Sequence, residues 1–163
     1  YGKYDWPASL HAETINTTQR WFIENTRLGI PVDFTNEGIR GICQTNGTNF
    51  PAQLAMGATW DMDLVYRTGR VTGKEGYVLG YTNLYSPILD VPQDPRWGRM
   101  VECYGESPFL VAELGIQQAK GIRSEKMGVT CKHFAVYGVP NGGRDGHART
   151  DPKVPPRELE MVH

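Results

Sequence analysis

The sequence predicts an α/β fold in which parallel strands alternate with helices. Three apolar runs of strand length lie near residues 31, 83 and 128, and a segment with helical periodicity separates each run from the next. A polar, Gly-rich loop follows each run. Strands joined through helices in this way pair in parallel with right-handed crossovers. Their spacings of 52 and 45 residues differ, which disfavours a solenoid of fixed repeat.

The first helix is expected over residues 9–27. This segment lacks Pro and Gly and carries apolar residues at helical spacing, and Pro7 lies just before it. Gly29 follows its expected end. Residues 28–35 form a short apolar run that predicts the first strand, and the polar residues 36–49 predict a loop beyond that strand.

The second unit repeats this order. Asp61 is expected to cap a helix whose apolar residues continue to Val78, and Gly80 is placed to stop it. Residues 83–91 are a second apolar run of strand length. Residues 92–105 are again polar and predict a loop.

The third unit begins at Ser107, an expected N-cap with Pro108 at the first helical position. Its helix is expected to reach about Ile122, and residues 128–136 predict the third strand. A long Gly-rich loop comes next, and residues 157–162 have the pattern of another helix.

Composition excludes several classes of partner. The 17 basic and 18 acidic residues leave a net charge of −1, and no run of Lys or Arg occurs, so neither a nucleic acid nor an acidic membrane surface is an expected partner. No stretch approaches the roughly 18 apolar residues of a membrane span. The chain begins with Tyr1 and ends within an expected helix, so both ends are expected to be cut. The compartment therefore stays unknown, with periplasmic and secreted locations both open.

Motifs for cofactors and metals are missing from the sequence. It contains no GxGxxG, P-loop, HExxH or GxSxG pattern, so no cofactor is expected. Three cysteines without CxxC spacing predict reduced, mostly buried thiols rather than a disulfide framework or a zinc knuckle. The histidines His133 and His147 could share a metal with Asp145, but their spacing does not favour it, and no metal site is predicted.

Ligands of parallel α/β folds bind beyond the carboxyl ends of the strands. This rule directs attention to three segments: residues 36–49, 90–106 and 132–147. Lys132 and His133 are adjacent at the end of an apolar run. They are either a solvent lysine beside a core-edge histidine or, where the strand ends, two hydrogen-bond donors for a polyhydroxylated or anionic ligand.

The segment 94–99 places two arginines, a tryptophan and a glycine directly after a strand. Arginine can bind a carboxylate or sugar hydroxyls, and Trp97 offers a flat apolar face for a pyranose ring. The alternative is a structural cluster of salt bridges with nearby acids, which are Asp90, Asp94, Glu102 and Glu106. Glu37 is ambiguous in the same way, because a lone glutamate in a loop is often only solvated.

The ordered motifs of the chain resemble the opening of the barrel domain in glycoside hydrolase family three, the β-glucosidases and β-xylosidases. The resemblance covers nearly the whole chain, and its strength lies in the order of the set. The segments that carry it are 28–31, 36–41, 50–55, 58–61, 86–91, 94–99, 104–108 and 132–134.

This resemblance implies a TIM-like (β/α)8 barrel, of which residues 1–163 would be the N-terminal portion with about the first three strand–helix units, truncated at the C-terminus. It also implies an exo-acting enzyme that retains anomeric configuration through a carboxylate nucleophile and an acid/base. By motif position, the residues that would hold the nonreducing sugar are Glu37, Arg99, Lys132 and His133.

No catalytic carboxylate is assigned within this chain. The family's nucleophile is an Asp in a Ser-Asp pair on a later strand, and both it and the acid/base are expected beyond His163. The acids in the candidate loops lie outside that motif; they are Asp90, Asp94, Glu102 and Asp145.

The implied function is hydrolysis of terminal, nonreducing β-linked glucose from a β-glucoside or oligosaccharide. A β-xylosidase and a non-catalytic sugar-binding barrel are the alternatives, and another α/β superfamily is a further one. Many family members have Asp where this chain has Glu37, so the longer side chain leaves the preferred sugar open. The sequence does not indicate the oligomeric state.

Overall fold

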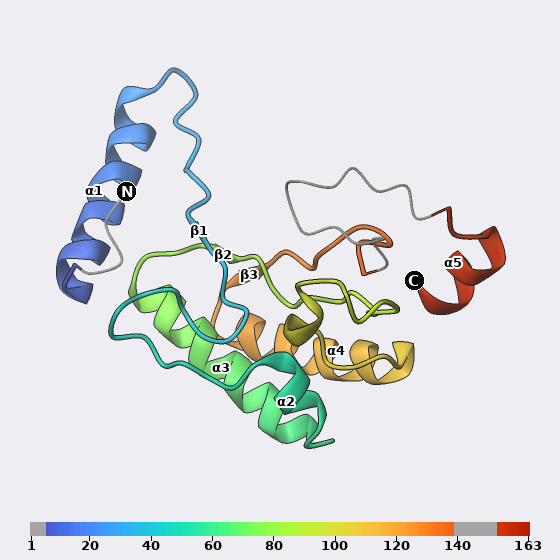
Figure 1. Cartoon of the computed structure of the whole chain (residues 1–163). Helices are drawn as coiled ribbons and strands as arrows, with labels where there is room; N and C mark the ends of the chain where they lie inside the picture. The colour runs from blue at the N-terminus through green and yellow to red at the C-terminus, as the bar shows by residue number, and fades with distance from the viewer. Residues whose placement is uncertain (1–5, 139–152) are drawn as a thin grey trace.

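Helices and short strands alternate along the chain in the computed structural model, which describes residues 6–138 and 153–163 (Figure 1). The elements in order are α1 (Ala8–Asn25), β1 (Thr35–Asn36), α2 (Gln53–Gly57), α3 (Met62–Val78), β2 (Asn83–Leu84), the 3-10 helix η1 (Met100–Glu102), α4 (Pro108–Ser124), β3 (Gly128–Val129) and α5 (Pro156–Val162).

The three strands form one parallel sheet in the order β1-β2-β3, which confirms the predicted α/β fold. Thr35 is aligned with Asn83, and Asn83 with Gly128. Each strand has only two residues and is much shorter than the apolar run that predicted it. An isolated parallel bridge between Ile88 and Lys132 keeps the segments after β2 and β3 together beyond the ladder.

The predicted helix caps are confirmed. The Asp61 carboxylate accepts a hydrogen bond from the backbone N–H of Leu64 at 2.9 Å, and α3 begins one residue later. The Ser107 hydroxyl accepts from the N–H of Leu110 at 3.4 Å, with Pro108 as the first residue of α4. The short helix α2 was not predicted, because five residues carry too little periodicity to distinguish them from a loop.

The core divides into three clusters of buried side chains. The first lies against the sheet, the second between α2, α3 and α4, and the third beneath the loop after β2. The buried members of the first cluster are Ile15, Phe34, Ile42, Leu79, Tyr81, Leu84, Ile122 and Met127. Those of the second are Met56, Val65, Val91, Tyr104, Leu110, Val111 and Leu114. Those of the third are Ile88, Trp97 and Cys103.

Helices α3 and α4 lie side by side on one side of the strands (Figure 1). Glycines make their close approach possible. A Cβ atom on Gly73 of α3 would lie 2.7 Å from the carbonyl oxygen of Ile122 and 3.0 Å from its Cα, and a Cβ on Gly69 would lie 2.5 Å from the carbonyl oxygen of Gln118. Backbone atoms cannot yield as a side chain can, so this contact requires glycine.

Replacement of Gly73 by alanine is expected to lower the free energy of unfolding by about 1–3 kcal/mol, because the methyl group pushes α4 away. In an unobstructed helix, the same change raises stability by roughly 0.5–1 kcal/mol, so the sign is diagnostic. Urea unfolding of the full-length protein measures it. Lys74→Ala, at the next and exposed position, is the control; an equal loss there, or a gain for Gly73→Ala, contradicts the packing argument.

The structure corrects two expectations and leaves others untested. Trp97, which was a candidate for stacking on a sugar, is only 2% exposed and packs edge-on against Tyr137 in the core. All three cysteines are free, but only Cys103 is buried.

The residues His147 and Asp145 of the metal hypothesis lie outside the described residues. None of the helices within residues 6–138 and 153–163 is long and apolar enough to cross a membrane.

Candidate functional site

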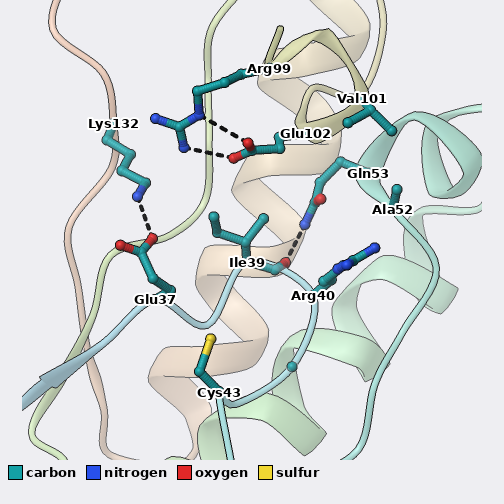
Figure 2. A pocket seen from close by; sticks show the side chains of 11 residues that line it. Glu37, Ile39, Arg40, Cys43, Ala52, Gln53, Arg99, Val101, Glu102 and Lys132 are labelled. Atoms are coloured by element: carbon teal, nitrogen blue, oxygen red, sulfur yellow. Dashed lines mark hydrogen bonds and ion pairs between the residues drawn. The ribbon is translucent and has the colours of Figure 1, made fainter. Parts of the chain in front are cut away.

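Three strand ends place the predicted site residues near one another. Glu37 directly follows β1, Arg99 lies in the loop after β2 and immediately precedes η1, and Lys132 and His133 follow β3. Glu37, Arg99 and Lys132 line a cavity of about 480 Å³, shown in Figure 2. His133 lies behind Arg99 and lines an adjoining cavity of about 210 Å³. The larger volume is within the range of about 300–1,000 Å³ that ligand pockets occupy.

Glu37 and Lys132 form an ion pair across the cavity, with 2.5 Å between Oε2 and Nζ. The two residues are 95 positions apart in the sequence and come from the outer strands of the sheet. The Lys132 side chain is 16% exposed, whereas that of Glu37 is 47% exposed. The pair therefore presents an accessible carboxylate and the end of a mostly buried lysine side chain to the same space.

Arg99 is held on two sides. Its Nε and Nη2 donate to the two carboxylate oxygens of Glu102 at 2.9 and 2.6 Å, an arrangement visible in Figure 2. Its Nη1 lies 3.0 Å from Nε2 of His133, and the Tyr137 ring lies within 5.8 Å of the guanidinium carbon. The predicted salt bridge is therefore present, with Glu102 orienting Arg99, and the binding of a ligand by Arg99 stays a prediction.

His133 is fixed in one tautomer by its two neighbours. A guanidinium group has donors only, so Nε2 of His133 must accept from Arg99. The ring proton therefore lies on Nδ1, which donates to Oδ2 of Asp90 at 2.7 Å. Asp90 thus engages the ring N–H group of His133 in this structure, and the role of His133 toward a ligand stays a prediction.

Adjacent positions on a regular strand would point Lys132 and His133 to opposite faces of the sheet. β3 ends at Val129, and Lys132 lies beyond it in an isolated bridge to Ile88, so this alternation does not apply. The peptide bond between Lys132 and His133 is cis. The Lys132 side chain contacts Glu37, and the His133 side chain contacts Arg99.

Two glutamines that the sequence analysis did not single out hold the loop that carries Glu37. Gln53 of α2 and Gln118 of α4 both donate from Nε2 to the carbonyl oxygen of Ile39, and each is 1% exposed. The hydroxyl of Tyr104 donates to Oε1 of Gln118, and burial raises the pKa of Tyr104 well above its ordinary value. The sequence signal that could have singled out Gln118 is a glutamine within an apolar helix face.

Two of the thiols near the site, those of Cys43 and Cys103, are poor nucleophiles. Partial desolvation of its sulfur by neighbouring atoms, followed by the charge of Glu37, raises the pKa of Cys43, which lines the larger cavity. Burial, together with the charges of Asp90 and Glu102, raises the pKa of Cys103 to about 12. Both groups are therefore protonated thiols near neutral pH, and thiolate chemistry is not supported here.

The site alternates carboxylates with cationic donors around one cavity. Glu37 can accept from hydroxyl groups, whereas Lys132 and Arg99 can donate to hydroxyl oxygens, which matches a neutral polyhydroxylated ligand. In the described part of the chain, no three His, Cys, Asp or Glu residues are grouped so as to hold a metal ion.

Comparison with known proteins identifies the family. The sequence model of the glycosyl hydrolase family 3 N-terminal domain matches residues 5–163. The chain belongs to glycosyl hydrolase family 3. This confirms the family that the ordered motifs predicted.

This family 3 chain is similar both to proteins named β-xylosidase and to proteins named β-glucosidase. It is 34% identical over 136 residues to a putative β-xylosidase of Formosa agariphila, a match that covers 78% of this chain and 18% of that protein. It is 32% identical over 126 residues to the periplasmic β-glucosidase of Salmonella typhimurium, a match that covers 74% of this chain and 16% of that protein. The chain thus spans less than a fifth of the length of these relatives.

Solved structures agree on the fold. The β-glucosidase of Listeria innocua in complex with glucose matches 79% of this chain and 19% of its own, with 36% identity and a TM-score of 0.73. The exo-1,3/1,4-β-glucanase of a Pseudoalteromonas species matches 100% of this chain and 21% of its own, with 26% identity and a TM-score of 0.90.

Proposed function

We propose that the full-length protein is a retaining, exo-acting β-glycosidase that hydrolyses terminal β-linked glucose, and that this chain supplies its sugar-binding residues. The proposed binding residues are Glu37, Arg99, Lys132 and His133. The observation that carries the proposal is the joint presence of Glu37, Lys132 and Arg99 on one cavity at the carboxyl ends of three parallel strands. Family membership supports the glycosidase class.

The physical basis is the match between this site and a pyranose. A sugar hydroxyl both donates and accepts, so it can bridge the Glu37 carboxylate and the Lys132 ammonium group, which lie 2.5 Å apart and must separate to admit it. Hydrogen bonds that sugar hydroxyl groups donate to a carboxylate such as Glu37 strengthen as positive charge develops in the oxocarbenium-like transition state, while the donors Lys132 and Arg99 position the sugar. Glycosidase activity therefore makes use of the charges that line the cavity.

We further propose that residues 1–163 are the N-terminal portion of one (β/α)8 barrel domain, with about its first three strand–helix units. Three observations support this. β1 and β3 each pair on one side only among the described residues, and α1 carries exposed large apolar side chains at Trp21, Phe22 and Ile23. The relatives are also several times longer than this chain. We propose that the nucleophile and the acid/base belong to residues beyond His163, and the presence of a Ser-Asp pair in that part of the full-length sequence would support this placement.

A β-xylosidase is the second candidate, since relatives of both names have similar identity to this chain. A non-catalytic sugar-binding barrel is the third. The preference for glucose is supported by the Listeria innocua enzyme solved with glucose.

Turnover by the full-length protein separates these functions. We expect hydrolysis of 4-nitrophenyl β-glucoside at a higher kcat/KM than 4-nitrophenyl β-xyloside, with the β-anomer as the first product in proton NMR spectra. A preference for the xyloside identifies a xylosidase. Saturable sugar binding without hydrolysis identifies a binding protein, and an α-anomer as the first product contradicts the retaining mechanism.

A further inference from the structure

We propose that Asp90 is a positioning residue of this site, which acts on Arg99 through His133 by holding the imidazole in the tautomer protonated on Nδ1. The inference rests on the proposed sugar-binding function and adds a residue to it. Asp90 follows β2 and His133 follows β3, so the contact joins two neighbouring strand ends.

The Asp90 carboxylate is built into the interior. Its side chain is 2% exposed, and its Oδ2 accepts two hydrogen bonds from His133, one from Nδ1 at 2.7 Å and one from the backbone N–H at 3.2 Å. A buried carboxylate is costly unless its hydrogen bonds compensate for the lost water. Both of these donors belong to His133, which makes the histidine the partner through which Asp90 acts.

The tautomer carries this effect to Arg99. With the proton on Nδ1, Nε2 is an acceptor and receives Nη1 of Arg99 at 3.0 Å. With the proton on Nε2, two N–H groups would face each other at that distance, and Nη1 would lose this acceptor. Glu102 holds Nε and Nη2, and His133 contacts Nη1 of the guanidinium group.

A fixed guanidinium group matters for binding a sugar. Arginine loses much rotamer freedom when it is ordered, and a site that orders it beforehand avoids that cost when the ligand arrives. The side chain of Arg99 is 13% exposed, so the site has already desolvated it. Asp90 would thereby contribute to catalysis without touching the sugar.

Two substitutions in the full-length enzyme separate hydrogen bonding from charge. Asp90→Leu removes the acceptor at similar volume. Asp90→Asn keeps it, because the backbone N–H of His133 cannot change its direction and so selects the amide orientation that presents oxygen. The same oxygen then accepts from Nδ1 and retains the tautomer.

We expect kcat/KM for 4-nitrophenyl β-glucoside to fall by about 100-fold in Asp90→Leu and by less than about 10-fold in Asp90→Asn, since misplacement of a binding group by about 1 Å has an effect of this size. Asp94→Asn is the matched control in the same loop, because Asp94 bonds Arg96 and not His133. Its effect should stay within about twofold. An equal loss in Asp90→Asn and Asp90→Leu overturns the acceptor mechanism.

A double-mutant cycle distinguishes positioning from a general structural role. If Asp90 acts through His133, then Asp90→Leu causes little further loss of kcat/KM in a His133→Ala background. Full additivity in the cycle overturns the inference. Thermal unfolding of each variant shows whether Asp90→Leu remains folded. If it does not, the kinetics of Asp90→Asn and the NMR spectrum described next test the inference.

Nitrogen-15 NMR of histidine-labelled full-length protein reads the tautomer without requiring turnover. We expect His133, assigned by its loss in His133→Gln, to show a protonated Nδ1 and an unprotonated Nε2. A protonated Nε2 in the wild-type protein overturns the inference even where the glycosidase function holds. Conversely, the predicted tautomer in a protein that hydrolyses no glycoside leaves the geometry standing and contradicts the proposed function.

Discussion

Replacement of Lys132 by methionine is expected to lower kcat/KM of the full-length enzyme for aryl β-glucosides by about 100- to 1,000-fold, or ~3–4 kcal/mol of transition-state stabilisation. The Lys132 side chain is mostly buried and its ammonium group is paired with Glu37, so its removal deletes a cationic donor and leaves the Glu37 carboxylate without this partner. Methionine keeps the length and the apolar stem of the side chain. Steady-state kinetics with 4-nitrophenyl β-glucoside provide the measurement.

The kinetic constants also indicate when the Lys132 contact forms. A loss mainly in kcat means that the hydrogen bond strengthens in the transition state, whereas a rise in KM alone means equal binding of substrate and transition state. Lys120→Met, at an exposed position of α4, is the control for loss of a positive charge. Undiminished turnover in Lys132→Met contradicts the assignment of this residue to the sugar site.

Replacement of Arg99 by lysine is the second change with a large expected effect, a loss of about 100-fold in kcat/KM. The positive charge is kept, but one ammonium group cannot reproduce the fork that meets both oxygens of Glu102 and also reaches Nε2 of His133. The expected loss therefore measures geometry rather than charge.

Arg96→Lys is the matched control for Arg99→Lys. Arg96 belongs to the same loop, but its side chain is 70% exposed and it pairs with Asp94 outside the cavity lining. The hydrogen bonds from Arg96 lower the pKa of Asp94 to about 2, so this pair stays ionised under any assay condition near neutral pH. Kinetics of the two variants should differ by more than about tenfold; equal losses would assign Arg99 to general loop stability.

Local sequence patterns correctly predicted the structural features that depend only on residues close together in the sequence. Asp61 and Ser107 cap helices because their side chains reach N–H groups three residues ahead, and this geometry requires no other part of the fold. The alternation of apolar runs and helical segments is also a local pattern, and it predicted a parallel α/β sheet. The length of each strand was overestimated, since pairing depends on where the partner strand runs and not on the apolar run itself.

The role of Trp97 shows where the residue type misleads. An indole beside two arginines is equally suited to a sugar and to a core, and only the packing of Ile88, Cys103 and Tyr137 around it decides between them. The buried glutamines raise the same difficulty, because Gln53 and Gln118 acquire their roles by meeting at the carbonyl group of Ile39.

The sequence by itself determined the family, the alternation of helices with three parallel strands, and four candidate residues that the structure brings near one another. These follow from motif order and from short-range periodicity, which the chain carries locally. Only the tertiary structure decided that Glu37 pairs with Lys132, that Glu102 and His133 hold Arg99, and that Asp90 determines the tautomer of His133. Each of the contacts that join different strand ends depends on strand order and register, and these are set by packing between segments many residues apart.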